Sequence, residues 1–285
     1  MIRTHRGLLT ALLGVVVVLA MVAGSLAMYI PTRHTANNTA YLGDDSNPNR
    51  LDVTAWITRV DTAAQVVSVS ISDIVPAGSL ADDNGYLRDD AKLSSTTTLQ
   101  NESVVLKKGV VVPDIEQRFA LDGTPTDYPF DRYTGEMDLH ILAADGTELP
   151  FAMTLFSTDP FFKIAPSDNQ GNSDGLINLD MWRSTPTLVF AIFVMIMMLG
   201  LAAAAATAAY YALRWHKGLL FPACSMMATI LFALFPLRNA VPGSPPLGSI
   251  IDFGSFFIAE IVIAVSLIAA VLFGYRVQRR SDLSG

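Results

Sequence analysis

Three charged side chains close to the C-terminus have types and spacing that suggest specific contacts within a membrane. Arg238 follows one long apolar run, Asp252 stands near the start of the next, and Glu260 lies well inside it. A charge placed among about 20 apolar residues costs roughly 3 kcal/mol on membrane-insertion scales, so each side chain needs a partner or a function. We expect Arg238 and Asp252 to pair at the outer interface and to clip together the loop between them.

Glu260 is the deepest of the three charges. It lies about ten residues into its apolar run, roughly 15 Å from the outer end and near the bilayer midplane. The carboxyl group could be protonated and hydrogen-bonded within the bundle, where Thr229 is at a matching depth. It could instead contact a polar group of another subunit or protein. A third interpretation is a proton or ion relay, although relays usually need a chain of polar groups.

Four apolar runs are long enough to cross a hydrocarbon core about 30 Å thick. They comprise residues 8–30, 186–213, 218–237 and 250–275. The sequence therefore predicts a membrane α-helical bundle of four spans. Its parts are an N-terminal membrane anchor at 1–30, a three-helix membrane domain at 186–276 with an outer Pro/Gly hairpin at 238–249, and a tail at 277–285.

The first run could alternatively be a signal peptide. Ser25 and Ala27 form a small-x-small pattern of the kind that precedes a cleavage site. The run of about 23 residues is longer than the roughly 7–15 apolar residues of a usual signal peptide, which favours an uncleaved anchor. Either outcome leaves the following domain outside the cytoplasm.

Basic residues next to the apolar runs set the orientation across the membrane. They precede the first run, separate the second from the third, and follow the fourth. The positive-inside rule places these three segments in the cytoplasm. We therefore predict a multi-pass protein of the cytoplasmic membrane, with cytoplasmic N and C termini and residues 31–185 extracytoplasmic.

Residues 51–185 contain short alternating patterns in place of long apolar runs. The alternation occurs at 51–57, 67–71, 104–112, 136–142, 151–156 and 161–164. Asp145-Gly146, between two of these segments, is a strong hairpin signal. Repeated short strands predict an extracytoplasmic, antiparallel all-β sandwich-like domain, with a polar and turn-rich linker at 31–50 before it.

The predicted outer domain is strongly acidic. Residues 31–185 hold 23 of the 26 acidic residues of the chain but only 11 of its 19 basic residues. This balance argues against binding to nucleic acid. The single cysteine, Cys224, lies in an apolar run, so the outer domain has no disulfide. No nucleophile, phosphate-binding or dinucleotide-binding motif of a familiar enzyme occurs, and we expect no catalytic residues and no cofactor.

Glu136, Asp138 and His140 form a weak candidate for a metal site. The three residues alternate, so a continuous strand would place them on one face, where imidazole and carboxylate groups could hold a metal ion. A solvated sheet face produces the same pattern without a metal. We favour the solvated face.

Another dense group of residues has the sequence YPFDRY. A proline flanked by aromatic side chains fixes a bend and supplies large apolar anchors, while its acidic and basic residues could satisfy backbone groups or each other. We expect a structural corner of the β domain; alternatively, the segment couples that domain to the helices. It comprises Tyr128, Pro129, Phe130, Asp131, Arg132 and Tyr133.

This motif and four C-terminal segments, 236–239, 242–248, Asp252 and 256–260, resemble a membrane-protein family common in actinobacteria, called domain of unknown function 4436. The likeness runs in the same order from the anchor through the outer domain to three helices. It implies family membership and no particular activity. Ile258 stands where the family leads us to expect a tryptophan, so one packing contact differs.

The YPFDRY motif is also similar to the aromatic-Pro-Phe-Asp motif of pentameric ligand-gated channels. This chain departs from those channels because it lacks the cysteine pair of the animal receptors and has three expected spans after the β domain instead of four. The likeness is an analogy of architecture only.

Together these patterns predict a cell-envelope interaction or accessory subunit, embedded in the lipid bilayer, whose outer domain binds a protein partner. The partner could be another envelope protein or a second copy of the chain. The alternative is a small transport or channel component in which Glu260 titrates and the outer hairpin gates. An enzyme has the least support.

Overall fold

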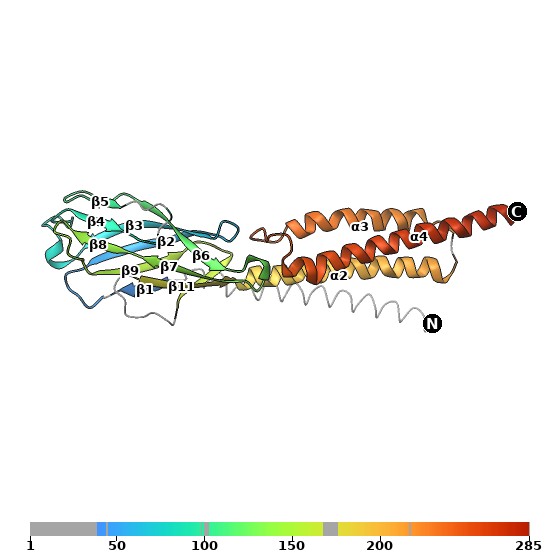
Figure 1. The fold of residues 1–285 in the computed structure, drawn as a ribbon, viewed down its shortest axis with the longest axis horizontal. Coiled ribbons are helices and arrows are strands. Elements are labelled where there is room, and N and C mark those ends of the chain that lie inside the picture. The colour runs from blue at the N-terminus through green and yellow to red at the C-terminus, as the bar shows by residue number, and fades with distance from the viewer. Residues whose placement is uncertain are drawn as a thin grey trace, which may run out of the picture.

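The computed structural model describes residues 39–43, 45–97, 99, 103–167, 176–216 and 218–284. The molecule is elongated, with a β domain at one end and helices at the other, joined end to end (Figure 1). The first span predicted at residues 8–30 lies outside the described residues, as does the choice between an anchor and a signal peptide.

The described part of the β domain contains eleven strands. They are β1 (Thr39–Gly43), β2 (Leu51–Asp61), β3 (Val66–Pro76), β4 (Ala91–Ser94), β5 (Val104–Leu106), β6 (Ile115–Gly123), β7 (Arg132–Asp138), β8 (His140–Ala143), β9 (Phe151–Ser157), β10 (Phe162–Pro166) and β11 (Leu176–Arg183). One sheet has the order β1-β9-β2-β3-β6-β7-β11-β10, and a smaller one has the order β5-β4-β8. A large β-sheet domain is therefore confirmed.

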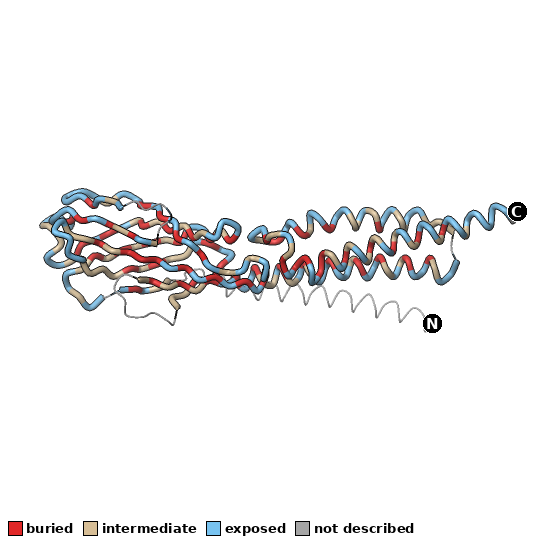
Figure 2. The backbone as a smooth tube through the Cα atoms, viewed as in Figure 1, coloured by how far each residue is buried: buried red, intermediate tan, exposed pale blue. Residues whose placement is uncertain are grey.

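The two sheets share one hydrophobic core. Val53 and Val69 from the large sheet belong to the same cluster of buried side chains as Leu93 and Ile141 from the small sheet. Buried and partly buried positions alternate along the first seven residues of β2 (Figure 2). The alternation arises because one face of the strand packs on the core while the other faces water. The buried positions are the apolar residues of the alternating pattern predicted at 51–57.

Strand β9 corrects the expectation of a purely antiparallel arrangement. It pairs in parallel with β2 and antiparallel with β1. Asp145 and Gly146 do lie in a tight turn, closed by a hydrogen bond from the Ala143 N–H to the Thr147 carbonyl. The chain then crosses to the other sheet, so β8 and β9 are not partners. The turn signal is local, whereas the partner of the next strand depends on distant segments.

Three further boundaries differ from expectation. Strand β1 lies inside the segment 31–50 that we assigned to a linker, and β5 ends at Leu106, well before residue 112. The strand expected at 136–142 is divided between β7 and β8, which belong to different sheets. Short strands of this kind carry too few alternating residues for their ends to be read from sequence.

Within the described residues, three helices are long and apolar enough to cross a membrane, which is consistent with a membrane protein. They are α2 (Thr185–Arg214), α3 (Phe221–Asn239) and α4 (Phe257–Ser284), the last preceded by a π-helical turn, η3 (Asp252–Phe256). Helix α4 also includes most of the segment 277–285 that we expected to be a tail.

Small side chains on α2 form the main contact surface within the helical part. Ala202, Ala205 and Ala209 are buried at spacings of three and four residues, and they cluster with Ala259 and Ile263 of α4. Small residues let helix backbones approach closely, which matters in lipid because apolar side chains gain nothing by leaving one apolar medium for another.

Replacement of Ala205 by leucine should destabilise the helical part by about 1–3 kcal/mol, because the added atoms enter a filled interface. Ala204→Leu is the matched control, since Ala204 is exposed. Thermal unfolding of the purified protein in detergent, followed by tryptophan fluorescence, should give a lower midpoint for Ala205→Leu alone. Equal midpoints for the two variants would contradict this packing.

Candidate functional site

The YPFDRY segment lies where the β domain meets the helices. It follows a short 3-10 turn at Pro125–Asp127 and leads into β7. Tyr128 is fully buried and belongs to the core cluster of the helices, together with Val241 and Ile251, and not to the core of the β domain. The segment therefore joins β6 to β7 at the helix-proximal end of the β domain, the location that the coupling alternative requires.

Asp131 forms a buried ion pair with Arg183, the last residue of β11. The Asp131 Oδ2 atom is 2.8 Å from Nη2 of Arg183, and Oδ1 is 2.9 Å from Nε. Tyr133 adds a third donor, its hydroxyl group lying 2.8 Å from Oδ2. The two charged side chains are 2% and 0% exposed. The sequence suggested Arg132 as a partner of Asp131, but Arg132 lies on the exposed face of β7.

Burial around this ion pair raises the pKa of both Tyr128 and Tyr133. Loss of hydration raises the pKa of Tyr128 to about 12. The pKa of Tyr133 is also raised, first by burial and then by its hydrogen bond to Asp131. Both hydroxyl groups therefore stay protonated at physiological pH, and Tyr133 remains a donor to the carboxylate.

Arg183 connects the β domain to the outer loop between α3 and α4. Its guanidinium group lies over the rings of Phe162 and Tyr128, at 4.3 and 4.8 Å from the ring centres. Gly243, in the loop, approaches so closely that a Cβ atom there would lie 2.3 Å from Nη1 of Arg183. One arginine thus contacts a carboxylate of the β domain, two aromatic rings and the loop of the helical part.

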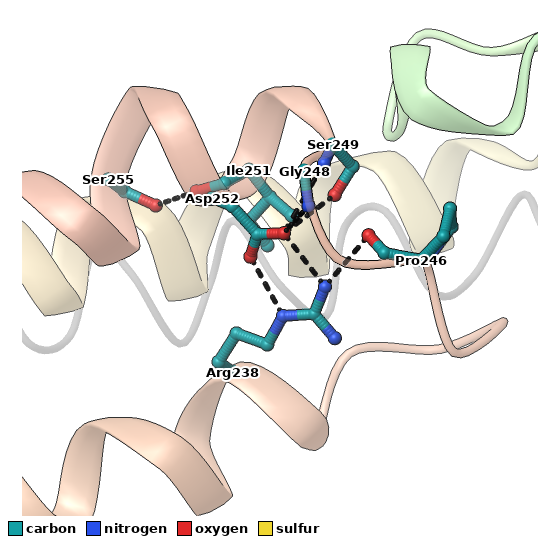
Figure 3. A network of polar contacts seen from close by, with 7 residues as sticks. All are labelled: Arg238, Pro246, Gly248, Ser249, Ile251, Asp252 and Ser255. Carbon is teal, nitrogen blue, oxygen red and sulfur yellow. Dashed lines mark hydrogen bonds and ion pairs between the residues drawn. The ribbon is translucent and has the colours of Figure 1, made fainter.

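A second buried ion pair closes the outer loop itself (Figure 3). Nε of Arg238 is 2.8 Å from Oδ1 of Asp252, and Nη2 is 3.0 Å from Oδ2. Nη2 also donates to the Pro246 carbonyl, while the Gly248 N–H donates to Asp252 at 2.8 Å. The structure thus brings Arg238 and Asp252 together, with the loop folded around them.

The solvation of this pair corrects one part of the expectation. We expected water at the interface to lower the cost of both charges, but the side chains of Arg238 and Asp252 are only 8% and 0% exposed. The carbonyl of Pro246 and the N–H groups of Gly248 and Ser249 take the place of water around the charges. Removing one partner of such a buried pair leaves an unpaired charge, a change that costs about 3–5 kcal/mol in measured cases.

Arg183 is the residue that sequence reasoning missed. A signal for it exists, because it directly precedes the apolar run of α2 at the end that we place outside the cytoplasm. Basic residues are depleted there by the positive-inside rule, as they are at Arg238. In the part of the chain that the structure describes, Arg183 and Arg238 run against the rule at the ends of helices, and each is buried in an ion pair.

Glu260 and Thr229 are not brought together. The Thr229 hydroxyl donates to the Ser225 carbonyl of its own helix at 2.9 Å. Glu260 is half-buried on the outer side of α4 and makes no hydrogen bond or ion pair within the described part of the chain. It borders a shallow apolar hollow lined by Phe253, Phe257, Ile258, Ile261 and Ala264.

Two of the three weak metal candidates, Asp138 and His140, are brought together, and the third is separate. Glu136 is exposed on β7. His140 lies between two other carboxylates, with Nε2 2.8 Å from Asp138 and Nδ1 2.5 Å from Glu148. Asp138 further accepts a hydrogen bond from the Thr96 hydroxyl, so it is not part of a freely solvated face. Among the described residues no group of three or more His, Cys, Asp or Glu side chains is arranged to hold a metal ion.

The close approach of Gly243 to Arg183 can be tested against a second glycine. Both Gly243 and Gly248 have positive φ, at 82° and 87°, but only Gly243 has a neighbour within reach of an added Cβ atom. Gly248→Ala should cost about 1–2 kcal/mol through backbone strain alone. Gly243→Ala should cost more, and its thermal midpoint should fall below that of Gly248→Ala. Similar losses in both variants would show that the loop does not depend on the contact with Arg183.

The carboxylates around His140 predict a pH dependence of stability. The hydrogen bond to Glu148, followed by the charges of Asp138 and Glu148, raises the pKa of His140 above its ordinary value of 6.5. Its stabilising contribution is therefore complete below about pH 6.5 and is lost as pH rises through the higher, folded-state pKa. For a partly exposed pair the loss should not exceed about 1 kcal/mol.

The measurement is the thermal midpoint of the wild type and of His140→Gln between pH 6 and pH 9. The wild-type midpoint should decline more steeply as pH rises, because only the wild type has the His140 imidazolium, which loses its charge in this range. Parallel declines would exclude a contribution from His140.

Comparison with known families divides the chain in two. Residues 41–181 match Domain of unknown function (DUF4436), and residues 183–277 match Domain of unknown function (DUF8686). No curated protein sequence matches the chain. The likeness to the first family is thus narrower than the sequence suggested, because the series from Arg238 to Glu260 falls in the second match. The resemblance to domain of unknown function 4436 is confirmed for the β domain, and in this chain that domain continues directly into a helical domain that resembles domain of unknown function 8686.

Proposed function

We propose that this chain is a multi-pass protein of the cytoplasmic membrane that serves as an interaction or accessory subunit of the cell envelope. In this proposal the β domain is a two-layer sandwich on the outer side, and residues 8–30 supply a fourth span. The orientation is supported by Arg214 and Arg276, which lie near the ends of α2 and α4 that point away from the β domain (Figure 1). By the positive-inside rule those ends face the cytoplasm.

The junction supports a role as a rigid platform. Two buried ion pairs and the ring of Tyr128 connect the β domain, the outer loop and the helices. Buried charged pairs tolerate little displacement, because separation exposes each charge to an apolar environment. The β domain is thereby held at a fixed height and angle above the membrane, an arrangement suited to presenting a binding surface.

The observation that carries the proposal is the position of Glu260. Glu260 is half-buried in an apolar hollow beside exposed Ile258 and Ile261, and we expect it about ten residues into its span, where lipid offers no donor. A polar group in that environment is stabilised by a hydrogen-bond donor or cation on a neighbouring helix. We assign that place to a transmembrane helix of a partner protein.

A second copy of the chain is a less suitable partner for Glu260. On the described helices, the basic residues other than Arg238 lie near the cytoplasmic ends, such as Arg214 and Arg276. The exposed hydroxyl of Thr229 already donates within α3. None of these offers a cation or free donor at the depth of Glu260, so a partner of different sequence is favoured.

The alternative of a transport or channel component has one observation in its favour, the titratable Glu260 itself. The described helix core, however, consists mainly of apolar side chains such as Val194, Met198 and Leu234, with few buried polar groups such as Ser266. The buried ion pairs are gathered at the end next to the β domain. A relay needs successive polar groups across the membrane, so the arrangement favours docking over conduction.

Docking at Glu260 can be tested by site-specific photo-crosslinking in native membranes. A photoreactive residue replacing Ile261 should give an adduct with another membrane protein, whereas one replacing exposed Phe232 on α3 should not. Glu260→Leu should weaken the Ile261 adduct by roughly 5- to 30-fold, the effect of losing an interhelical hydrogen bond of about 1–2 kcal/mol. Glu260→Gln should retain most of it, because the amide preserves hydrogen bonding.

Three results would contradict docking by a partner protein. The adduct from position 261 could form within one chain or between identical chains, it could be equally strong from position 232, or it could be unaffected by Glu260→Leu. An unchanged thermal midpoint of each variant serves as the control for folding.

A further inference from the structure

A polar groove lies on the outer face of β6, β7 and β11, close to the helices. Its volume is about 390 Å³. The lining residues that face outward are Asp122, Arg132, Thr134, Asp180 and Trp182. The groove is separate from the buried junction, because Tyr133 and Met181, between these positions along their strands, point into the core.

Strand register arranges these side chains in two rows. Thr134 lies opposite both Asp122 and Asp180, which gives an acidic row across three strands. Trp182 lies opposite Arg132 on one side and Lys163 on the other, which gives a basic row with an aromatic ring at its centre. The rows are two residues apart along each strand, so they share a face and are separated by roughly 7 Å.

The charges of the two rows are unsatisfied within the described part of the protein. The side chains of Arg132, Lys163, Asp122 and Asp180 make no hydrogen bond or ion pair with its residues. The strands hold the two rows apart, and the opposite charges of the rows do not pair with each other. The groove therefore presents a positive and a negative subsite at a fixed spacing.

The basic row is the one nearer to the membrane. Trp182 precedes Thr185, the first residue of α2, by three positions, while Asp180 lies farther from the helix. Tryptophan prefers the headgroup layer, which adds about 5–8 Å to each side of the hydrocarbon core. Phe130, two residues before Arg132, is 54% exposed at the same end of the domain. The basic row thus lies at headgroup depth and the acidic row just beyond it.

We infer that this groove binds the headgroup of a phospholipid carrying a primary ammonium group, as in phosphatidylethanolamine. In such a lipid the phosphodiester is close to the acyl chains and the ammonium group is farther out, the same order as the two rows. Arg132, which lines the groove, binds the phosphate through charge-assisted hydrogen bonds, and Lys163, on β10 beside the groove, adds a second positive charge. Asp122 and Asp180 accept hydrogen bonds from the ammonium group, whose three N–H donors suit two carboxylates.

The same geometry predicts selectivity among lipids. A lipid with an uncharged outer headgroup, such as phosphatidylglycerol, gains the phosphate contacts but has no cation for the acidic row. A trimethylammonium headgroup retains the charge but has no N–H to donate to the carboxylates. The inference requires only that α2 crosses the bilayer and is independent of any partner at Glu260.

The test is native mass spectrometry of the full-length protein in detergent, titrated separately with phosphatidylethanolamine, phosphatidylcholine and phosphatidylglycerol. Wild type should bind phosphatidylethanolamine about ten-fold more tightly than the other two, a difference equal to one charged hydrogen bond. Arg132→Gln should weaken all three lipids. Asp180→Asn should weaken phosphatidylethanolamine alone and leave phosphatidylglycerol unchanged or stronger, because it removes a negative charge.

Two exposed residues of β6 outside the groove provide matched controls. Arg118→Gln and Glu116→Gln make the same changes of charge and should leave all three affinities unaltered. Asp122→Asn repeats the acidic-row test should Asp180→Asn fail to fold. Equal affinity for the three lipids, or equal losses in the control variants, would overturn the inference. So would tight binding of soluble glycerophosphoethanolamine, which would identify a free metabolite as the ligand.

Discussion

The buried ion pair between Asp131 and Arg183 is the interaction on which the arrangement of the molecule depends. Arg183 ends β11 and stands two residues before α2, so its position fixes how the chain passes from sheet to helix. Its guanidinium group is held by Asp131, covered by two aromatic rings and approached by Gly243 of the outer loop. With this arginine held in place, neither the β domain nor the loop can shift without uncovering a charge.

The pair between Arg238 and Asp252 extends the same constraint to the helices. It closes the loop between α3 and η3, and that loop supplies both the Pro246 carbonyl to Arg238 and the contact of Gly243 with Arg183. Two buried pairs therefore meet at one loop. A rigid connection of this kind keeps the polar groove of the β domain and the Glu260 face of α4 in a constant relation to each other, as the proposed role in presenting binding surfaces requires.

Sequence patterns predicted one of the two ion pairs at this junction but not the other. The pairing of Arg238 with Asp252 could be anticipated because the residues flank one short hairpin, and a short connection leaves few alternatives. The partner of Asp131 could not, because Arg183 is 52 positions away and comes together with Asp131 only when β7 and β11 pair. The nearer Arg132 was a misleading choice, since adjacent residues on a strand point to opposite faces.

The sequence by itself determined the division into an acidic β domain and long apolar helices, because composition and period respond to burial and need no knowledge of partners. Tertiary structure alone decided the strand order, including the parallel pairing of β9 with β2, and the separation of Glu136 from His140. It also decided that Thr229 bonds within its own helix and not to Glu260, and that charges from four strands form two rows. Each of these depends on contacts between segments that are far apart in the chain. Local periodicity carries no information about such contacts.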